Sequence, residues 1–386
     1  MIGADGSGSL RVLIAPDSFK GSMSAIDVAR LVAEGWATVR PDDALLPLPL
    51  ADGGEGTLDT VAAAVPGARR VAVTVPGPDG RPVNTHWLRL PDGTGVVELA
   101  GCSGLTLLDR PRPADAHTRG FGRAIAAALD AGATRLLLAL GGSASTDGGA
   151  GVLVELGARL LDAAGTPIPP GNRGLGRLQT VDLTGMRPLP PGGAVILTDV
   201  ANPLLGPDGA APVFGAQKGL SPSGTVIAEH NLRRLARYLN VDAMAAGAGA
   251  AGGTGFGLLA WGAEVAPGGE FLGELAGLPA AVATADVVVT GEGRFDVQSW
   301  SGKLPSHVAG LAASAGIPTL LVAGQVSAST SGRFCASEDL SVLAGAPWRA
   351  IAHPSRYLRL AGAALARRMA VAGAEPVGLG SPAGDR

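Results

Sequence analysis

The feature that most constrains the fold is a glycine-rich segment at 141–151, GGSASTDGGAG, which joins a predicted strand to a predicted helix. The apolar run 136–140 is short enough for a buried strand, and residues 152–161 carry apolar side chains at helical spacing. Five glycines let the loop turn sharply and approach a ligand. A loop that leads into a helix N-terminus suits a phosphate group, because free N–H groups gather there. A structural turn capped by Asp147 or Thr146 is the alternative.

The same order of strand, loop and helix recurs at both ends of the chain. Its five predicted strands lie at 11–15, 45–50, the start of 285–305, 318–324 and 340–345. Five such units are the number in a flavodoxin-like parallel sheet. Between them, short alternating segments in the stretch 71–99 are separated by turns, which is typical of an antiparallel meander.

These patterns predict an α/β protein of two domains. The first is a flavodoxin-like five-stranded parallel sheet domain built from the N- and C-terminal parts, 1–70 and 285–386. The second is a mixed α/β domain, residues 71–284, inserted between them. Ligand sites in such proteins often lie where domains meet, so we expect the active site between the two.

Composition excludes several classes of protein. The net charge of −3, with no basic face, argues against a nucleic-acid or membrane-surface binder. Two distant cysteines exclude a disulfide framework, and five scattered histidines argue against a zinc site. The first residues, MIGADGSGSL, lack the parts of a signal peptide, and no uninterrupted apolar run of membrane-spanning length follows. We therefore expect a cytoplasmic protein.

Acidic residues recur in the loops that follow the predicted strands. They stand beside glycine or a hydroxyl residue, at Asp17, Asp52, Glu55, Asp147, Asp199, Glu292 and Asp296. Because functional loops gather at the carboxyl ends of strands in α/β units, these side chains are expected at one edge. Such carboxylates hold magnesium or accept a hydroxyl proton. Each acid taken alone is explained better as a cap or turn residue, but their repetition favours a site.

Lysine is rare in this chain. Of 30 basic residues only Lys20, Lys218 and Lys303 are lysines, and all three stand beside glycine. They are candidates for compact ammonium groups at a phosphate, although chance placement is the alternative. The sequence has no G-x-S-x-G motif and no cysteine within a motif, which argues against a hydrolase nucleophile. Acids, lysines and glycine loops fit phosphoryl transfer, since that chemistry depends on positioning and charge neutralisation.

Seven motifs, in order along the chain, carry a resemblance to a known family. They are VLIAPDSFKGSMSA at 12–25, PLADGGEGT at 49–57, GGSASTDGGAG at 141–151, TDVANPLLG at 198–206, FGAQKG at 214–219, GAGAAGGTGFGLLAWGAE at 247–264 and VVVTGEGRFDVQSWSGKLP at 287–305. The sequence resembles the bacterial type I glycerate kinases, the glycerate 2-kinase family. The resemblance implies ATP-dependent, magnesium-assisted phosphorylation of D-glycerate to 2-phosphoglycerate, with in-line transfer at an interdomain cleft. Phe121 stands where the family has threonine, and the region after 326 is divergent.

On this basis we assign hypothetical roles to residues of the motifs. The phosphate of ATP is expected to be cradled by Gly141, Gly142, Ser143, Ser145 and Thr146. The catalytic residues are expected to be Asp199 as base or orienter, Asp296 as the second choice, and Lys20. Substrate binding is assigned to Asp17, Ser18, Arg294 and Lys303. Magnesium binding is assigned to Asp52 and Glu55.

Two other functions stay open. A kinase of another small hydroxy acid would share every motif. A non-catalytic ligand-binding protein on the same fold would have lost some of the strand-end acids and lysines, all of which are present. The expected partners are the small molecules D-glycerate and ATP, with no nucleic acid and no membrane, and a homodimer is left open.

Overall fold

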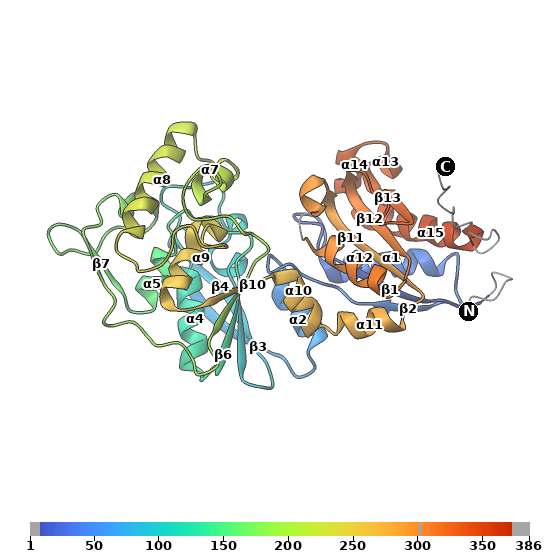
Figure 1. Ribbon diagram of the computed structural model, residues 1–386, viewed down its shortest axis with the longest axis horizontal. Coiled ribbons are helices and arrows are strands. Elements are labelled where there is room, and N and C mark those ends of the chain that lie inside the picture. The colour runs from blue at the N-terminus through green and yellow to red at the C-terminus, as the bar shows by residue number, and fades with distance from the viewer. Residues whose placement is uncertain (1–7, 301–302, 373–386) are drawn as a thin grey trace, which may run out of the picture. The chain divides into compact units, whose positions relative to one another are not determined.

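The computed structural model describes residues 8–300 and 303–372. Residues 1–7, part of the start that was compared with a signal peptide, lie outside the described residues, as do Ser301 and Gly302 of the seventh motif. Contacts divide the chain into two compact units (Figure 1). Unit 1 joins the two ends of the chain, up to Leu50 and from Gly277, and unit 2 comprises Ala51–Ala276. The sequence pattern predicts these breaks after residues 70 and 284.

Unit 1 contains a five-stranded sheet in which all strands are parallel. In chain order the strands are β1 (Arg11–Pro16), β2 (Ala44–Pro47), β11 (Val287–Phe295), β12 (Thr319–Val326) and β13 (Ala336–Asp339). Their order across the sheet is β13-β12-β11-β1-β2, which is the flavodoxin-like order. The predicted fold class of this part is confirmed.

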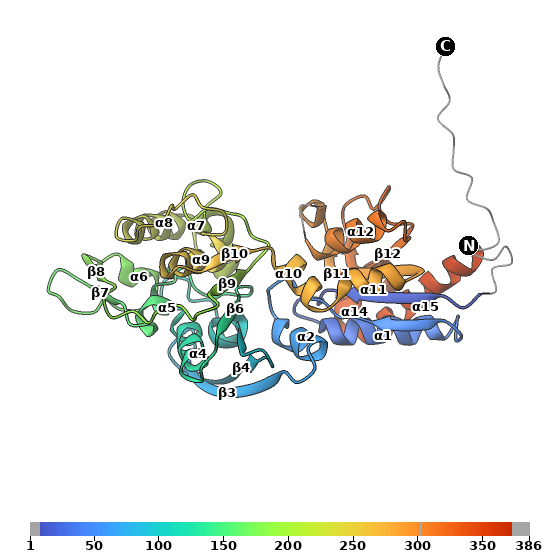
Figure 2. The same ribbon diagram turned by 60° about the horizontal axis from the view of Figure 1, so that its bottom comes forward.

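Helices cover both faces of this sheet. They are α1 (Ala25–Ala37), α11 (Leu278–Thr284), α12 (Leu304–Ser314), α13 (Leu340–Ala344), α14 (Pro347–Ala352) and α15 (Pro354–Ala372). Helices α1 and α15 pack on each other, and their apolar side chains share one core with Val12, Ile14 and Leu320. Helix α12 lies on the opposite face (Figure 2), where Ala309 packs with residues such as Leu321.

The fifth strand of unit 1 lies earlier than the sequence pattern predicts. The segment 340–345 is predicted as a strand, but Leu340–Ala344 form helix α13, and β13 precedes them. The carboxylate of Asp339 accepts hydrogen bonds from the N–H groups of Ser341 and Val342, which makes it the helix N-cap. Gly345, in the left-handed conformation at φ 72°, ends the helix. The apolar residues of this segment suit either a strand or a helix, and the two caps favour the helix.

Unit 2 contains a mixed six-stranded sheet and a two-stranded ribbon. The sheet strands are β3 (Arg69–Pro76), β4 (Pro82–Arg89), β5 (Thr94–Glu98), β6 (Arg135–Ala139), β9 (Ala194–Leu197) and β10 (Glu264–Ala266), and the ribbon strands are β7 (Arg159–Leu161) and β8 (Thr180–Asp182). Strands β3, β4 and β5 form the predicted antiparallel meander. Strands β5, β6, β9 and β10 are parallel, so their carboxyl ends form one edge of the sheet.

Two groups of helices enclose this sheet. The helices of unit 2 are α2 (Thr57–Ala64), α3 (Ala100–Ser103), α4 (Arg119–Asp130), α5 (Ala150–Glu155), α6 (Asn172–Leu175), α7 (Ala210–Phe214), α8 (Pro222–Ala236), α9 (Ala250–Trp261) and α10 (Gly268–Leu275). Helices α2 and α10 cover one face through Leu58, Leu137 and Leu272. Helices α4, α5 and α9 share the larger core on the other face.

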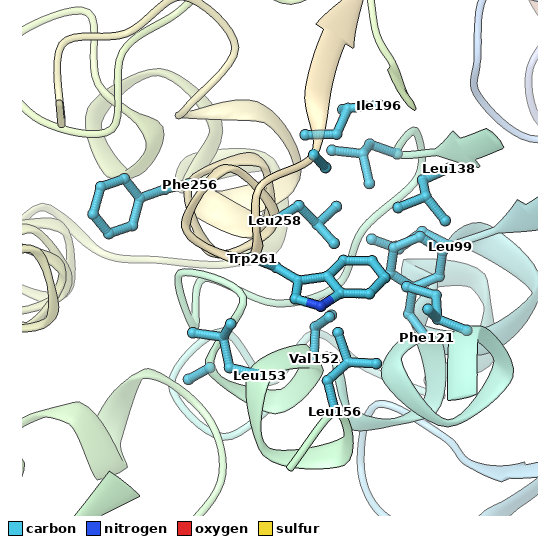
Figure 3. Packing of buried hydrophobic residues seen from close by; sticks show 14 of the residues in the cluster. Leu99, Phe121, Leu138, Val152, Leu153, Leu156, Ile196, Phe256, Leu258 and Trp261 are labelled. Atoms are coloured by element: carbon cyan, nitrogen blue, oxygen red, sulfur yellow. The ribbon is translucent and has the colours of Figure 1, made fainter. Parts of the chain in front are cut away.

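Figure 3 shows the Trp261 ring of α9 lying among side chains from α5, α4 and the sheet. Phe121 is fully buried in the same core. The residue that departs from the family pattern is therefore a packing residue, and helix α4 still begins at Arg119.

The helix predicted over 152–161 is shorter than its apolar pattern suggests. Helix α5 ends at Glu155, and strand β7 occupies Arg159–Leu161. Gly157 separates them, with φ 108°, and a Cβ atom built there would lie 2.2 Å from the carbonyl oxygen of Gly185. The close backbone contact at this glycine ends the helix. In the part of the chain that the structure describes, no helix combines the length and apolarity needed to cross a membrane.

Candidate active site

A glycine-rich turn lies across the carboxyl edge of the unit 2 sheet. It comprises residues 51–57, which enter unit 2 and carry Asp52 and Glu55. The Gly141 N–H donates a 3.0 Å hydrogen bond to the Gly53 carbonyl, and a Cβ atom built on Gly141 would lie 2.3 Å from Gly54 Cα. A side chain on Gly141 would push this turn away from the edge of the sheet. The close contact places Asp52 and Glu55 beside the ends of β6 and β9.

Asp52 and Asp199 both lie at the beginning of helix α10. The Asp199 carboxylate accepts a 3.2 Å hydrogen bond from the Gly269 N–H through Oδ1. A Cβ atom built on Gly268 would lie 2.2 Å from the Asp52 carbonyl oxygen, so the two backbones touch. Asp52 Oδ1 itself accepts from the Gly54 N–H at 2.9 Å. The amino-terminal end of a helix, where N–H groups are free, attracts negatively charged groups.

Glu98 is an acid at this edge to which the sequence patterns assign no role. It ends strand β5, is 8% exposed, and accepts a 3.1 Å hydrogen bond from the Leu58 N–H at the start of α2. Burial raises the pKa of Glu98 to about 7, and the charges of Asp59 and Glu55 act in the same direction. The available signal was its position, because Glu98 lies near the end of the apolar segment GVVELA, much as the other acids follow predicted strands.

Glu98 should make the stability of the protein depend on pH. Its pKa is about 7 in the folded state against an ordinary value of 4.5, so its contribution is complete below pH 4.5 and is lost as pH rises through 7. The Glu98→Gln variant keeps the shape and cannot lose a proton. Relative to wild type, it should gain about 1 to 3 kcal/mol of unfolding free energy between pH 5 and 8. Urea unfolding at several pH values measures this gain.

The exposed Glu270 of α10 offers a control for this experiment. Glu270→Gln makes the same chemical change at the surface of the same unit, and its stability should follow the wild-type pH curve. An equal stability difference between Glu98→Gln and wild type at pH 5 and pH 8 would contradict the assignment.

The hydroxyl groups of the predicted phosphate cradle are bonded within the fold. Ser143 Oγ lies 3.3 Å from Ser145 Oγ and donates to the Ala251 carbonyl at 3.2 Å. Thr146 Oγ1 donates to the Pro113 carbonyl at 2.8 Å, and Ser143, Ser145 and Thr146 are buried. Gly142 is exposed, and Gly141 is partly so. The hydroxyls therefore shape the loop, while its glycines offer the accessible backbone, and phosphate binding by the five residues stays a prediction.

Asp147 has the structural role that the sequence offered as an alternative. Its carboxylate accepts hydrogen bonds from the N–H and hydroxyl groups of Thr118, each at 2.9 Å. It also accepts from the N–H groups of Gly149 and Gly151, each at 3.2 Å. These bonds join the first turn of α5 to the segment that precedes α4.

Lys218 is a buried cation against the same loop. Its side chain is 3% exposed, and Nζ donates a 2.5 Å hydrogen bond to the Ser145 carbonyl. Burial lowers the pKa of Lys218 to about 7, while the charge of Asp147 opposes that shift. The sequence made this lysine a candidate for a phosphate site because lysine is rare in the chain. The structure makes it a support of the glycine-rich loop.

A left-handed turn at the beginning of α9 completes this support. Ala251, Gly252 and Gly253 have φ values of 54°, 69° and 86°. A Cβ atom on Gly252 would lie 2.0 Å from the Ser145 carbonyl oxygen and 2.9 Å from Lys218 Nζ. These contacts leave no room for side chains at the helix start, which explains its glycines.

The remaining predicted residues lie at the carboxyl edge of the unit 1 sheet. The Asp17 N–H donates to the Gly291 carbonyl at 2.8 Å, which continues the pairing of β1 with β11. Lys303 Nζ lies 4.0 Å from Glu292 Oε2, and the positive charge of Lys20 also acts on Glu292. Arg294 Nε lies 3.9 Å from Asp296 Oδ2. The structure thus gathers lysines and acids around Glu292.

The predicted site residues fall into two groups, one on each unit. Unit 1 contains Asp17, Ser18, Lys20, Arg294, Asp296 and Lys303. Unit 2 contains Asp52, Glu55, Gly141, Gly142, Ser143, Ser145, Thr146 and Asp199. Within each unit the group lies in loops at, or in the strands that reach, the carboxyl edge of the sheet. Their individual roles stay predictions.

The acids of unit 2 suit magnesium held jointly with a nucleotide. Among residues 8–300 and 303–372, no group of three or more His, Cys, Asp or Glu side chains is arranged around a metal position. Mg²⁺ bound with a nucleotide needs only one or two carboxylates, because phosphates and water complete its shell. Asp52 and Glu55 on one short turn fit that requirement.

The flavodoxin-like unit has acids, Lys20 and Lys303 at the carboxyl edge of its sheet. The mixed α/β unit has acids and a glycine-rich loop at the corresponding edge. This combination is typical of an α/β phosphotransferase. The chain belongs to the glycerate kinase family, because residues 12–369 match the sequence model of that family.

Named relatives agree with this assignment. The chain is 41% identical over 328 residues to the glycerate kinase of Bacillus subtilis (strain 168), which covers 82% of this chain and 86% of that protein. It is 40% identical over 327 residues to the glycerate 2-kinase of Escherichia coli (strain K12), with the same coverage. The crystal structure of a candidate glycerate kinase 2 from Salmonella typhimurium LT2 matches with a TM-score of 0.77 at 36% identity. That match covers 94% of this chain and 99% of the other.

Proposed function

We propose that this protein is a glycerate 2-kinase, which transfers the γ-phosphoryl group of ATP to D-glycerate and releases 2-phosphoglycerate and ADP. The observation that carries the proposal is the family match over residues 12–369, within which every charged residue assigned above is present. The Escherichia coli relative, named glycerate 2-kinase, supports the regiochemistry. A kinase of this family acts on an alcohol group, in agreement with the phosphoryl-transfer chemistry expected of the site.

Phosphoryl transfer requires the reacting groups to be positioned and their charge to be neutralised. Asp199 is proposed to accept the proton of the reacting hydroxyl, with Asp296 as the second choice. The Oδ1 atom of Asp199 accepts a 3.2 Å hydrogen bond from the Gly269 N–H, which fixes the orientation of the carboxylate. Positioned general bases of this kind accelerate reactions by about 10²–10⁴-fold.

Charge neutralisation is assigned to cations and backbone donors. Lys20, Arg294 and Lys303 are proposed to bind a phosphate or the glycerate carboxylate, because all three approach the edge of the unit 1 sheet. Gly141 and Gly142 offer accessible backbone at the end of β6. Asp52 and Glu55 are proposed to hold Mg²⁺, which when bound neutralises negative charge on the β- and γ-phosphates. A cytoplasmic location and a homodimer stay predictions.

Phosphorus NMR tests the proposed reaction directly. Purified protein is incubated with ATP, Mg²⁺ and D-glycerate, and the position of the product phosphate is followed together with the loss of ATP. A 2-phosphoglycerate signal is expected. Formation of 3-phosphoglycerate would retain the kinase and overturn the regiochemistry. Turnover of another hydroxy acid in place of D-glycerate would favour the alternative kinase, and no turnover of any would favour a binding protein.

A further inference from the structure

Glu292 of unit 1 is a buried acid to which the assignments above give no function. It lies in β11, between β1 and β12, and its side chain is 7% exposed. Glycines on both sides of it allow the strands to pack closely. A Cβ atom on Gly291 would lie 2.2 Å from the Val322 carbonyl oxygen, and one on Gly293 would lie 3.3 Å from Phe19 Cα. The backbone around Glu292 is therefore fixed, and its carboxylate has a defined position.

The surroundings of this carboxylate are polar but incomplete. Burial raises the pKa of Glu292, while a hydrogen bond from Ser299 and the charges of Lys303 and Lys20 oppose the shift. Lys303 Nζ lies 4.0 Å from Oε2, at the outer limit of an ion pair. The Oε1 atom is buried and has no hydrogen-bond partner in the described part of the chain. A buried acceptor that is left unpaired is costly, and folded proteins seldom contain one.

A second polar atom at the same sheet edge has the same property. Ser18 follows β1, the strand that pairs with β11, and its hydroxyl is buried with no partner among residues 8–300 and 303–372. The Ser18 N–H donates to Asp17 Oδ1 at 2.6 Å, which fixes the backbone that carries this hydroxyl. Two unpaired buried groups, one in β11 and one just after the neighbouring β1, indicate a place where a ligand supplies the missing partners.

The chemistry of these groups defines the ligand. A carboxylate oxygen accepts a hydrogen bond from a hydroxyl, a serine hydroxyl both donates and accepts, and lysine ammonium groups attract an anion. A small hydroxy acid presents hydroxyl groups beside a carboxylate and matches all three. The exposed Lys20 and partly exposed Lys303 are accessible from solvent, as such a ligand requires.

We propose that Glu292 binds a hydroxyl group of the hydroxy-acid substrate, with Ser18 as a second hydrogen-bonding group and with Lys20 and Lys303 attracting the substrate carboxylate. This inference rests on the proposed function, since it takes D-glycerate as the substrate. It makes Glu292 a residue that determines specificity for hydroxylated over deoxygenated acids. A hydrogen bond to a charged group contributes enough to change affinity by about 10- to 100-fold.

Equilibrium binding of D-glycerate to the full-length protein, measured calorimetrically without ATP, tests the proposal. Glu292→Gln should raise the dissociation constant by about 10- to 100-fold. Two analogues locate the contact: D-lactate lacks the hydroxyl at C3, and 3-hydroxypropionate lacks the one at C2. For the analogue that lacks the contacted hydroxyl, wild type and Glu292→Gln should have the same dissociation constant. Persistence of the difference for both analogues, or an unchanged dissociation constant for D-glycerate, would overturn the proposal.

Glu338 provides a matched control, because it is also 7% exposed in the unit 1 sheet but pairs with Arg368 at 2.7 Å. Glu338→Gln should leave D-glycerate affinity unchanged. Ser18→Ala is a second variant, and its affinity should fall in the same direction if Glu292→Gln folds poorly. A wild-type protein that phosphorylates D-glycerate while Glu292→Gln binds it normally would refute this inference alone. A wild-type protein that neither binds nor phosphorylates D-glycerate would refute the proposed function itself.

Discussion

The Asp199→Asn variant is expected to lose about 10²–10⁴-fold of kcat for D-glycerate phosphorylation. Asparagine retains an oxygen that accepts the Gly269 N–H, bonded at 3.2 Å in the wild type, so the loop after β9 keeps its position. The amide carries no charge and cannot take up the hydroxyl proton. The loss should therefore appear in kcat, with a small change in KM for either substrate.

Two comparisons make this result specific. Asp208→Asn makes the same change at an exposed position further along the same loop, and its turnover should match the wild type. Asp296→Asn tests the second choice, and a greater loss there than in Asp199→Asn would transfer the base to unit 1. Turnover of Asp199→Asn within a few-fold of wild type would end its assignment as the base.

The Gly252→Ala variant is expected to lose about 3 to 5 kcal/mol of unfolding free energy. The left-handed φ of 69° disfavours any side chain, and the new methyl group would lie 2.0 Å from the Ser145 carbonyl oxygen. That carbonyl also accepts the Lys218 ammonium, so moving it disturbs a buried cation as well. Thermal unfolding should show a Tm that is lower by roughly 10 °C.

Gly165→Ala separates the contact from the backbone strain. Gly165 has φ 72°, but a Cβ atom there would meet no atom within 4 Å. This variant should lose only about 1 kcal/mol, the cost of the left-handed conformation. Equal losses in the two variants would show that the contact with Ser145 and Lys218 adds nothing to stability.

Much of the fold was predictable because it depends on local patterns. Short apolar strands followed by glycine-rich loops and helices predicted the parallel sheet of unit 1, and the structure confirms that class. The alternating segments of the meander were equally clear. Residues 340–345 were assigned to a strand because apolar periodicity over five or six residues suits both structures. The Asp339 cap and Gly345 decide the outcome, and both are visible in the sequence.

The sequence could predict which residues gather at the candidate site, but it could not predict their hydrogen-bond partners. Asp199 lies at the carboxyl edge of the unit 2 sheet because it follows β9, whereas Asp52 reaches that edge through the contacts of its turn with Gly141. Their bonding partners could not be predicted, since these depend on contacts between distant segments. The buried hydroxyls of Ser143 and Thr146 illustrate this, because sequence alone cannot distinguish a hydroxyl that faces a ligand from one that faces Ala251 or Pro113.

Glu98 and Glu292 remained without a role for a related reason. Both side chains are buried, and Glu292 Oε1 has no hydrogen-bond partner in the described part of the chain. These are properties of the folded chain. Desolvation depends on everything packed around a group, so a sequence pattern does not report it. Glu98 lies in a segment predicted as a strand, whereas Glu292 was expected in the loop after a strand and lies within β11 instead. The position of an acid near a strand end was the one signal available.

The interrupted path of unit 1 sets the order in which the protein can fold during synthesis. Strand β1 lies inside the sheet and pairs with β11, so that Ala15 and Thr290, bonded at 2.9 Å, are 275 positions apart. A ribosome releases all of unit 2 before β11 exists, so unit 2 can fold first. Strands β1 and β2 meanwhile wait with uncovered apolar faces and unpaired edges, which is the condition that favours aggregation. From the order of the strands alone, we therefore expect the nascent N-terminal segment to be prone to aggregation until β11 has been synthesised.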